Sequence, residues 1–449
     1  MSSPNNQTPE PQQRKTDWRL IMRALRHRNY RLFFGGQGIS LIGTWMTRVA
    51  TGWLVYRLTG SAFLLGLVSF ASQIPILLLG PFSGVWVDRL NRHRVLVITQ
   101  TLSMLESFAL AVLALMHVIT VPEIIWLNLF QGSVNAFDMP ARQAFVIEMV
   151  ENPEDLGNAI ALNSSLVNAA RLIGPSVAGL IIAAVGEGYC FLIDGISYMA
   201  VIASLLAMVI VRRQSERKHE SVLAELREGW DYVRGFRPIW SILLLLSLIS
   251  LVGMPYTALM PIFAGKILHG GAHTLGFLMA AIGVGALIGA IALAARRTVL
   301  GLGRLIPMTC AGFGAGLMAF SASHWFWLSM LVLVGTGYCF MQEMAASNTI
   351  LQTIVEHKKR GRVMSFYAMA FQGVAPFGSL IAGAAAARIG APETLMIGGG
   401  ICILGAGLFA MQLPAIRQSI RPIYAQIGII PEVAAAINTV SVLQEPPEE

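Results

Sequence analysis

Residues 84–94, GVWVDRLNRHR, contain one aspartate and three arginines in close succession. This stretch separates two mainly apolar runs, 62–87 and 95–117. A helix needs about 20 apolar residues to cross the hydrocarbon core of a bilayer, and both runs are long enough. A short charged loop between two such runs predicts a pair of transmembrane helices joined at a membrane surface.

Similar runs recur along the whole chain. Of its 449 residues, 55% are hydrophobic and 12% are charged, whereas a soluble domain carries about 25% charged residues. So little charge cannot cover a water-facing surface of this size, and we expect an all-α polytopic membrane protein. The sequence predicts twelve transmembrane helices, at 32–57, 62–87, 95–117, 121–139, 160–185, 188–211, 239–263, 274–295, 303–322, 325–345, 363–387 and 394–413.

The basic residues predict the orientation of these helices. Only Arg57, Lys266 and Arg388 fall in the loops on one side, and Arg48 and Arg171 lie within apolar runs. The rest of the 32 lysines and arginines belong to the other side, which is therefore predicted to be cytoplasmic and to carry both termini. The net charge of +8 then reflects topology and contact with anionic lipid, and we expect no nucleic-acid partner.

The longest internal loop divides the chain into two parts of six helices each. We predict a cytoplasmic N-terminal tail, an N-terminal six-helix bundle, a cytoplasmic linker, a C-terminal six-helix bundle and a cytoplasmic C-terminal tail, at 1–29, 30–212, 213–238, 239–415 and 416–449. In the linker, Val222, Leu226, Trp230 and Val233 recur at helical spacing. This pattern fits equally an amphipathic helix on the membrane surface and a solvated linker helix.

The two halves are weakly similar in sequence. A shift of about 205 residues places Asp138 on Glu343 and Gly132 on Gly337. The same shift pairs further glycines, Gly80 and Gly84 with Gly285 and Gly289. Two parallel halves of this kind build the central site of many transporters at the interface between them.

Residues 84–94 resemble the signature G-x-x-x-D-R-x-G-R-R/K of the major facilitator superfamily. Gly84, Asp88, Arg89 and Arg92 match it, and Asn91 replaces the second glycine, a mild change because asparagine tolerates left-handed backbone. Asp88 lies at the expected cytoplasmic end of its helix, where it can bind the positive N-terminus of the eleventh helix. We expect these residues to form a cytoplasmic gate; the structural alternative is that the arginines only set topology.

Residues 170–179 resemble the G-x-x-x-G-P-x-x-G-G signature of the superfamily's antiporters. Gly174, Pro175 and Gly179 match, while Ala170 and Ala178 stand where glycines usually do. Small residues permit close helix packing, and the proline bends the helix. In the family this motif accompanies export, so the resemblance implies efflux; the alternative is an ordinary kinked packing helix.

Ionisable residues within the predicted helices are costly in a bilayer and are therefore candidates for function. The candidates for carrying a proton or binding a substrate are Arg48, Glu106, Asp138, Arg171, Asp194 and Glu343. Glu106 is the deepest acid and the first candidate for the proton carrier, unless it neutralises a buried arginine. Arg48 and Arg171 either bind an anionic group of the substrate or pair with the acids.

Four further stretches resemble one branch of the superfamily, the exporters similar to the enterobactin exporter and to macrolide-efflux proteins. They are RNYRLF (28–33), GTWM (43–46), FDMPARQ (137–143) and DGISY (194–198). The resemblance implies proton-coupled export of a small amphipathic molecule, drug-like or siderophore-like, by alternating access. It also implies a monomer in the bacterial inner membrane whose partners are the substrate, protons and lipid. Import or facilitated diffusion by the same fold is the alternative.

Other functions have less support in the sequence. No group of His, Asp, Glu or Ser has catalytic spacing within the apolar runs, so we do not expect an enzyme. His269 and His273 lie in a loop with two glycines, and we expect neither a metal site nor a cofactor. A non-transporting scaffold that docks through the C-terminal tail is a further alternative.

Overall fold

The computed structural model describes residues 22–150, 152–209, 222–296, 298–357 and 359–429, and every regular element in these ranges is helical. The helices of the first half are α2 (Arg28–Thr59), α3 (Ala62–Arg89), α4 (Arg92–Leu115), α5 (Val121–Met149), α6 (Leu156–Val185) and α7 (Glu187–Leu206). Single turns, η1 (Arg23–Arg26) and η2 (Pro153–Asp155), precede α2 and α6.

The second half begins with a linker helix, α8 (Val222–Gly235). Its longer helices are α9 (Arg237–Leu248), α10 (Tyr256–Ile262), α11 (Ala272–Ala294), α12 (Leu302–Ser321), α13 (Phe326–Ile354), α14 (Arg360–Ala368), α15 (Ala375–Ile389) and α16 (Ala391–Gln426). Three π-helical turns lie within this half: η3 (Ile249–Gly253) between α9 and α10, η4 (Phe263–Ile267) after α10, and η5 (Met369–Gly373) between α14 and α15.

Ten helical stretches in the described part of the chain are long and apolar enough to cross a membrane. The prediction of an all-helical polytopic membrane protein is confirmed. The helices α2 and α5 are outside these ten, although they are as long as their neighbours, and both contain polar and charged residues along their length. Arg48 lies within α2, and Asp138 and Arg142 lie within α5.

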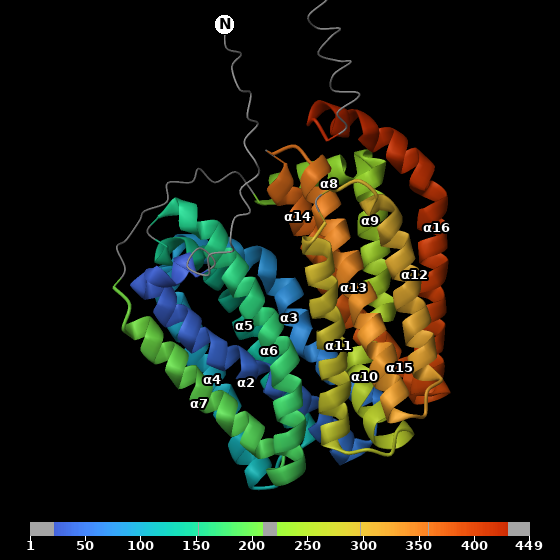
Figure 1. Cartoon of the computed structure of the whole chain (residues 1–449). Coiled ribbons are helices and arrows are strands. Elements are labelled where there is room, and N and C mark those ends of the chain that lie inside the picture. The colour runs from blue at the N-terminus through green and yellow to red at the C-terminus, as the bar shows by residue number, and fades with distance from the viewer. Residues whose placement is uncertain (1–21, 151, 210–221, 297, 358, 430–449) are drawn as a thin grey trace, which may run out of the picture.

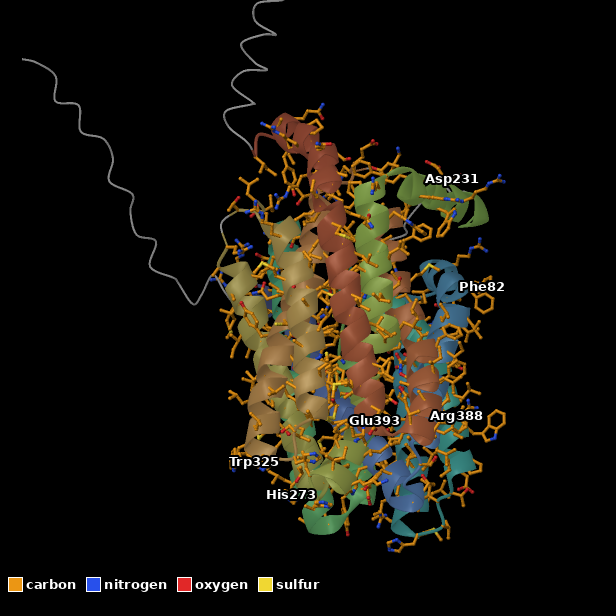
Figure 2. The ribbon with its side chains drawn as sticks, turned by 90° about the vertical axis from the view of Figure 1, so that its right-hand side faces the viewer. Phe82, Asp231, His273, Trp325, Arg388 and Glu393 are labelled. Carbon is orange, nitrogen blue, oxygen red and sulfur yellow. The ribbon has the colours of Figure 1, made fainter. Side chains whose placement is uncertain are left out.

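The helices form two groups that follow the order of the chain (Figure 1). The helices α2 to α7 gather on one side and α9 to α16 on the other. Between the groups, α6 packs along α11 and α3 packs along α15. We call the end where α2 begins and α16 ends the terminal face, and the other end the opposite face. In Figure 2, Asp231 lies toward the terminal face, and Arg388 and Glu393 lie toward the opposite face.

The similarity between the halves is visible in one helix crossing. A side chain at Gly132 of α5 would lie 2.5 Å from the carbonyl oxygen of Ser72 of α3. Its counterpart Gly337 of α13 meets the carbonyl oxygen of Ile282 of α11 in the same way. In both halves the paired glycine lets two helix backbones approach closely.

The linker helix packs on the protein itself. Val233 is fully buried, and the ring of Trp230 contacts Trp240 of α9 and Phe366 of α14. An ion pair of 2.5 Å joins Glu228 to Arg362 of α14. The side chains predicted at 222 and 226 lie outside the described residues. The described part of α8 therefore docks on α9 and α14. Neither the membrane-surface helix nor the solvated linker helix considered from the sequence had included this contact.

The last helix extends beyond its predicted apolar run. The run was expected to end at residue 413, whereas α16 continues to Gln426. Ile416 and Ile420 are buried one helical turn apart, so the extension has an apolar face that packs on the protein. An apolar face of this kind is shorter than a span and escapes a search for long apolar runs.

Candidate functional site

Two arginines meet on one tryptophan where the two groups of helices adjoin. The guanidinium carbon of Arg48 (α2) lies 4.9 Å from the ring centroid of Trp45, and that of Arg171 (α6) lies 5.3 Å from it. Gly174 makes this possible, because a side chain there would collide with Trp45 and come within 3.0 Å of the carbonyl oxygen of Ile42. The indole thus holds two cations next to each other.

These arginines have no carboxylate partner among the described residues. None of the ion pairs found there includes Arg48 or Arg171. The Nε atom of Arg171 is buried without any hydrogen-bond partner. The sequence left two interpretations of Arg48 and Arg171 open, binding of an anionic substrate group or ion pairing with the buried acids. The described residues show no such ion pairing.

The arginine pair lies deep in the protein and faces the other half of the chain. Arg171 is near the middle of α6, about 20 Å from either end at about 1.5 Å per residue. The backbone beside it packs on Gly283 of α11. One turn beyond Arg48, Gly52 would place a side chain 3.5 Å from Pro261 of α10. Arg48 is nevertheless exposed, so we attribute its exposure to the space between the halves.

Two carboxyl groups, Glu106 of α4 and Asp194 of α7, form a second cluster on the other side of α2. Thr47 donates a 2.7 Å hydrogen bond to Asp194 Oδ2. Ser107 Oγ lies 3.1 Å from the same oxygen and 3.4 Å from Glu106 Oε2, so its hydroxyl joins the two carboxyls. Both acids are buried, and no cation pairs with either among the described residues. Glu106 therefore does not neutralise a buried arginine there.

Asp138 and Glu343, the acids related by the internal repeat, have different surroundings. Asp138 pairs with Arg142 and accepts hydrogen bonds from Thr99 (2.9 Å) and Gln100 (2.7 Å), both on α4. Glu343 accepts one bond, 2.9 Å from Ser347, and its Oε2 is buried without a partner. Asp138 thus anchors α5 to α4, whereas Glu343 is a lone buried carboxyl.

The predicted gate residues lie at the end of α3 and the start of α4. Arg92 pairs with Glu148 of α5 at 2.8 Å, and Arg89 is exposed. Gly84 has open space beside it, and the side chain of Asp88 lies outside the described residues. The helix α14 packs on α8, α9 and α13, and α3 packs on η5, the π-helical turn that follows α14.

The two halves touch most closely near the opposite face. A side chain at Gly66 of α3 would lie 2.9 Å from the Cα of Gly383 of α15. One turn along, Ser69 Oγ donates a 3.1 Å hydrogen bond to Ser379 Oγ. On the other side of the molecule, Gly179 of the antiporter-like motif would place a side chain 3.0 Å from the Cα of Gly276 of α11. Backbone contacts this close leave no opening between these helices.

The sequence indicated some of these residues and missed others. Trp45, Thr47 and Ser107 were not predicted, although they hold the arginines and the acids. The sequence did contain one signal: five polar residues of α4 recur at helical spacing and are buried, namely Thr99, Gln100, Ser103, Glu106 and Ser107. A polar stripe of this kind on a membrane helix indicates the face that turns toward other helices.

The comparisons with known proteins assign the class. A family model described as transmembrane secretion effector matches residues 22–438. The chain is 27% identical to the staphyloferrin A transporter of Staphylococcus aureus, over 83% of this chain and 93% of the relative. It is 26% identical to the multidrug efflux pump Tap of Mycolicibacterium fortuitum (84% and 93%) and 24% identical to macrolide efflux protein A of Streptococcus pyogenes (84% and 95%).

Solved structures agree on the fold. The chain superposes on a D-xylose–proton symporter with a TM-score of 0.68 at 14% identity, covering 85% of this chain and 96% of the other. For a nucleoside transporter the TM-score is 0.67 at 12% identity, covering 86% and 99%. The protein is a membrane transporter of the major facilitator type. It belongs to the transmembrane secretion effector family, whose model covers most of the chain.

Proposed function

We propose that the protein is a proton-coupled exporter of a small amphipathic molecule, drug-like or siderophore-like, in the bacterial inner membrane. Relatives named for macrolide or multidrug efflux support export as the direction. The antiporter-like motif supports it as well, because Gly174 and Gly179 let α6 pack closely on both α2 and α11.

The single observation that carries the mechanism is the uneven contact between the two groups of helices. Close backbone contacts cluster near the opposite face, as at Gly66 and Gly383, while in the middle of the molecule Arg48 is exposed and Arg171 is half-buried beside it. A transporter that alternates between two openings has this form when it is open on one side only. The terminal face is then the cytoplasmic side, as the basic residues predict, and the conformation is open toward the cytoplasm.

In this proposal α2 and α5 cross the membrane together with the ten apolar stretches, which gives twelve spans in two groups of six. The charges within α5 are compatible with spanning because they face protein, and Arg48 of α2 faces the space between the two groups of helices. Asp138 and Arg142 pair with each other, and Asp138 is bound by two side chains of α4. A paired and hydrogen-bonded charge inside a helix group costs far less than one that faces lipid.

The proton site in this proposal is the pair formed by Glu106 and Asp194. Two buried carboxyls joined by one serine hydroxyl, without a cation beside them, are costly when both are ionised. The pair therefore holds at least one proton and can release it when α2, α4 and α7 shift. Glu343 is the corresponding candidate in the second half.

The experiment that tests the proposed function is transport in inverted membrane vesicles. An amphipathic dye should accumulate in vesicles that contain the protein when a proton gradient is applied, and accumulation should stop when the gradient is collapsed. Asp88→Ala should reduce accumulation by about tenfold or more while insertion is unchanged, since loss of the gate charge prevents closure of the cytoplasmic side.

Arg94→Gln is the matched control, because Arg94 is a charged residue in the first turn of α4, beside the four predicted gate residues but not one of them. Accumulation that persists without a gradient would contradict proton coupling. Normal accumulation by the Asp88→Ala variant would contradict the gate, and accumulation only when the gradient is reversed would indicate an importer.

A further inference from the structure

The unpaired arginines on Trp45 carry an inference about the substrate, which rests on the proposed function. We propose that Arg48 and Arg171 form the binding site for an acidic group of the substrate, so that the transported molecule is an organic anion. The site lies between α2 and α6 and faces the second half of the chain. It selects carboxylate, phosphate or sulfonate amphipaths over cationic ones.

The electrostatics of the pair are the first argument. Two guanidinium groups on one indole repel each other, and the repulsion is stronger in a site that water only partly fills. No carboxylate among the described residues compensates them, whereas other arginines of the protein have partners: Arg57 pairs with Glu187 at 3.0 Å. An anion placed between Arg48 and Arg171 would remove the repulsion and give the orphaned Nε of Arg171 a partner.

The available acids are the second argument. The carboxylate of Asp194 is bound by Thr47, the sequence neighbour of Arg48, but Thr47 and Arg48 point from different faces of α2. Gly43 packs directly on Asp194, where a side chain would lie 2.5 Å from Oδ1. That face of α2 is therefore closed against α7, and the acid is held away from the arginines. The protein keeps its acids and its central cations apart.

The shape of the site is the third argument. Arginine offers a planar fork of donors that binds carboxylate and phosphate through two parallel hydrogen bonds. Trp45 fixes the two forks by stacking, so little side-chain freedom is lost when an anion binds. The exposure of Arg48 in mid-helix gives the anion a route to the site, and the contacts at Gly66 and Gly179 close the route from the opposite face.

The test compares two probes that differ in charge and share one aromatic body, 1-pyrenesulfonate and 1-pyrenemethylammonium. Their binding to the purified full-length protein in phosphatidylcholine nanodiscs is measured by fluorescence anisotropy, with citrate as a competitor. We expect the sulfonate to bind about tenfold or more tightly than the ammonium probe, because each well-made charged hydrogen bond gives about that factor. Arg48→Gln and Arg171→Gln should each remove most of this preference.

Arg388→Gln is the control, since Arg388 is an exposed arginine toward the opposite face (Figure 2). Arg48→Lys and Arg171→Lys keep the charge and should lose only part of the affinity, which excludes misfolding as the cause. Equal binding of both probes, no saturable binding of the sulfonate, or unchanged affinity in both glutamine variants would overturn the inference. Anion binding without gradient-driven transport would instead contradict the proposed function alone.

Discussion

At the scale of single residues, the charged groups of the membrane interior separate into two sets. Arg48 is exposed, Arg171 is half-buried, and neither has an acid partner among the described residues, whereas Glu106 and Asp194 are buried and bound by hydroxyl groups. Thr47, next to Arg48, joins the sets through one helix. A movement of α2 caused by the substrate would therefore change the hydrogen bond to Asp194.

Asp194→Asn tests the proton role. Asparagine still accepts hydrogen bonds from Thr47 and Ser107 but has no charge, so the variant should insert and bind 1-pyrenesulfonate as the wild type does. Gradient-driven export should fall by about tenfold or more, because the pair can no longer take up and release a proton. Transport is measured in inverted vesicles, with Glu123→Gln as the control, since Glu123 caps α5 at Thr120 away from the pair. Unchanged coupling in Asp194→Asn would assign these acids to packing.

The sequence predicted these residues individually but not their arrangement. An ionisable side chain within a predicted membrane helix was enough to select Arg48, Glu106 and Asp194 as functional candidates. Which of them meet depends on helix rotation and packing, and these arise from contacts between residues far apart in the chain. Two of the stretches that resemble the exporter branch, GTWM (43–46) and DGISY (194–198), do meet in the structure, where Gly43 packs on Asp194.

At the scale of elements, glycines determine how closely the helices cross. Gly174→Ala should lower the free energy of unfolding by about 1–3 kcal/mol and with it the melting temperature, because the added methyl would collide with Trp45. The displaced Trp45 should also weaken binding of 1-pyrenesulfonate. Gly157→Ala in the same helix is the matched control, since its added methyl meets no atom within 4 Å and should leave stability unchanged or slightly raised. Equal melting temperatures for the two variants would disprove this role of Gly174.

The positions of the membrane helices were predictable from the long apolar runs, whereas the features of α8 and α16 that do not depend on such runs were not. Each predicted run overlaps a helix of the structure. The helix α8 was expected from its periodicity, but its docking site was not, because Phe366 and Arg362 lie far along the chain. The extension of α16 depends on two buried isoleucines, and its end is not marked by any apolar run.

At the scale of the whole molecule, alternating access requires the contact near the opposite face to open. Ser69→Cys with Ser379→Cys places two thiols where the serine oxygens are 3.1 Å apart, one on each half. In a background without Cys190, Cys310, Cys339 and Cys402, oxidation should join the halves and stop transport, and reduction should restore it. The cross-linked protein should still bind 1-pyrenesulfonate, because the site opens to the terminal face.

The single-cysteine variants Ser69→Cys and Ser379→Cys are the controls and should transport normally after oxidation. Full transport by a protein shown by mass spectrometry to be cross-linked would rule out opening at this contact. Loss of probe binding on cross-linking would place the access route of the anion on the opposite face instead.

The π-helical turns give the two halves different mechanical properties. Within the part of the chain that the structure describes, all three lie in the second half, at 249–253, 263–267 and 369–373, while α2 and α6 of the first half contain no such turn. A π-helical turn interrupts the regular backbone hydrogen bonds of an α-helix. Here Ser250 of η3 donates a hydrogen bond to the carbonyl oxygen of Phe371 in η5, so two of these turns are in contact. Because helices bend most readily where the regular hydrogen-bond pattern is broken, we expect the bending that accompanies transport to be concentrated at these turns of the second half.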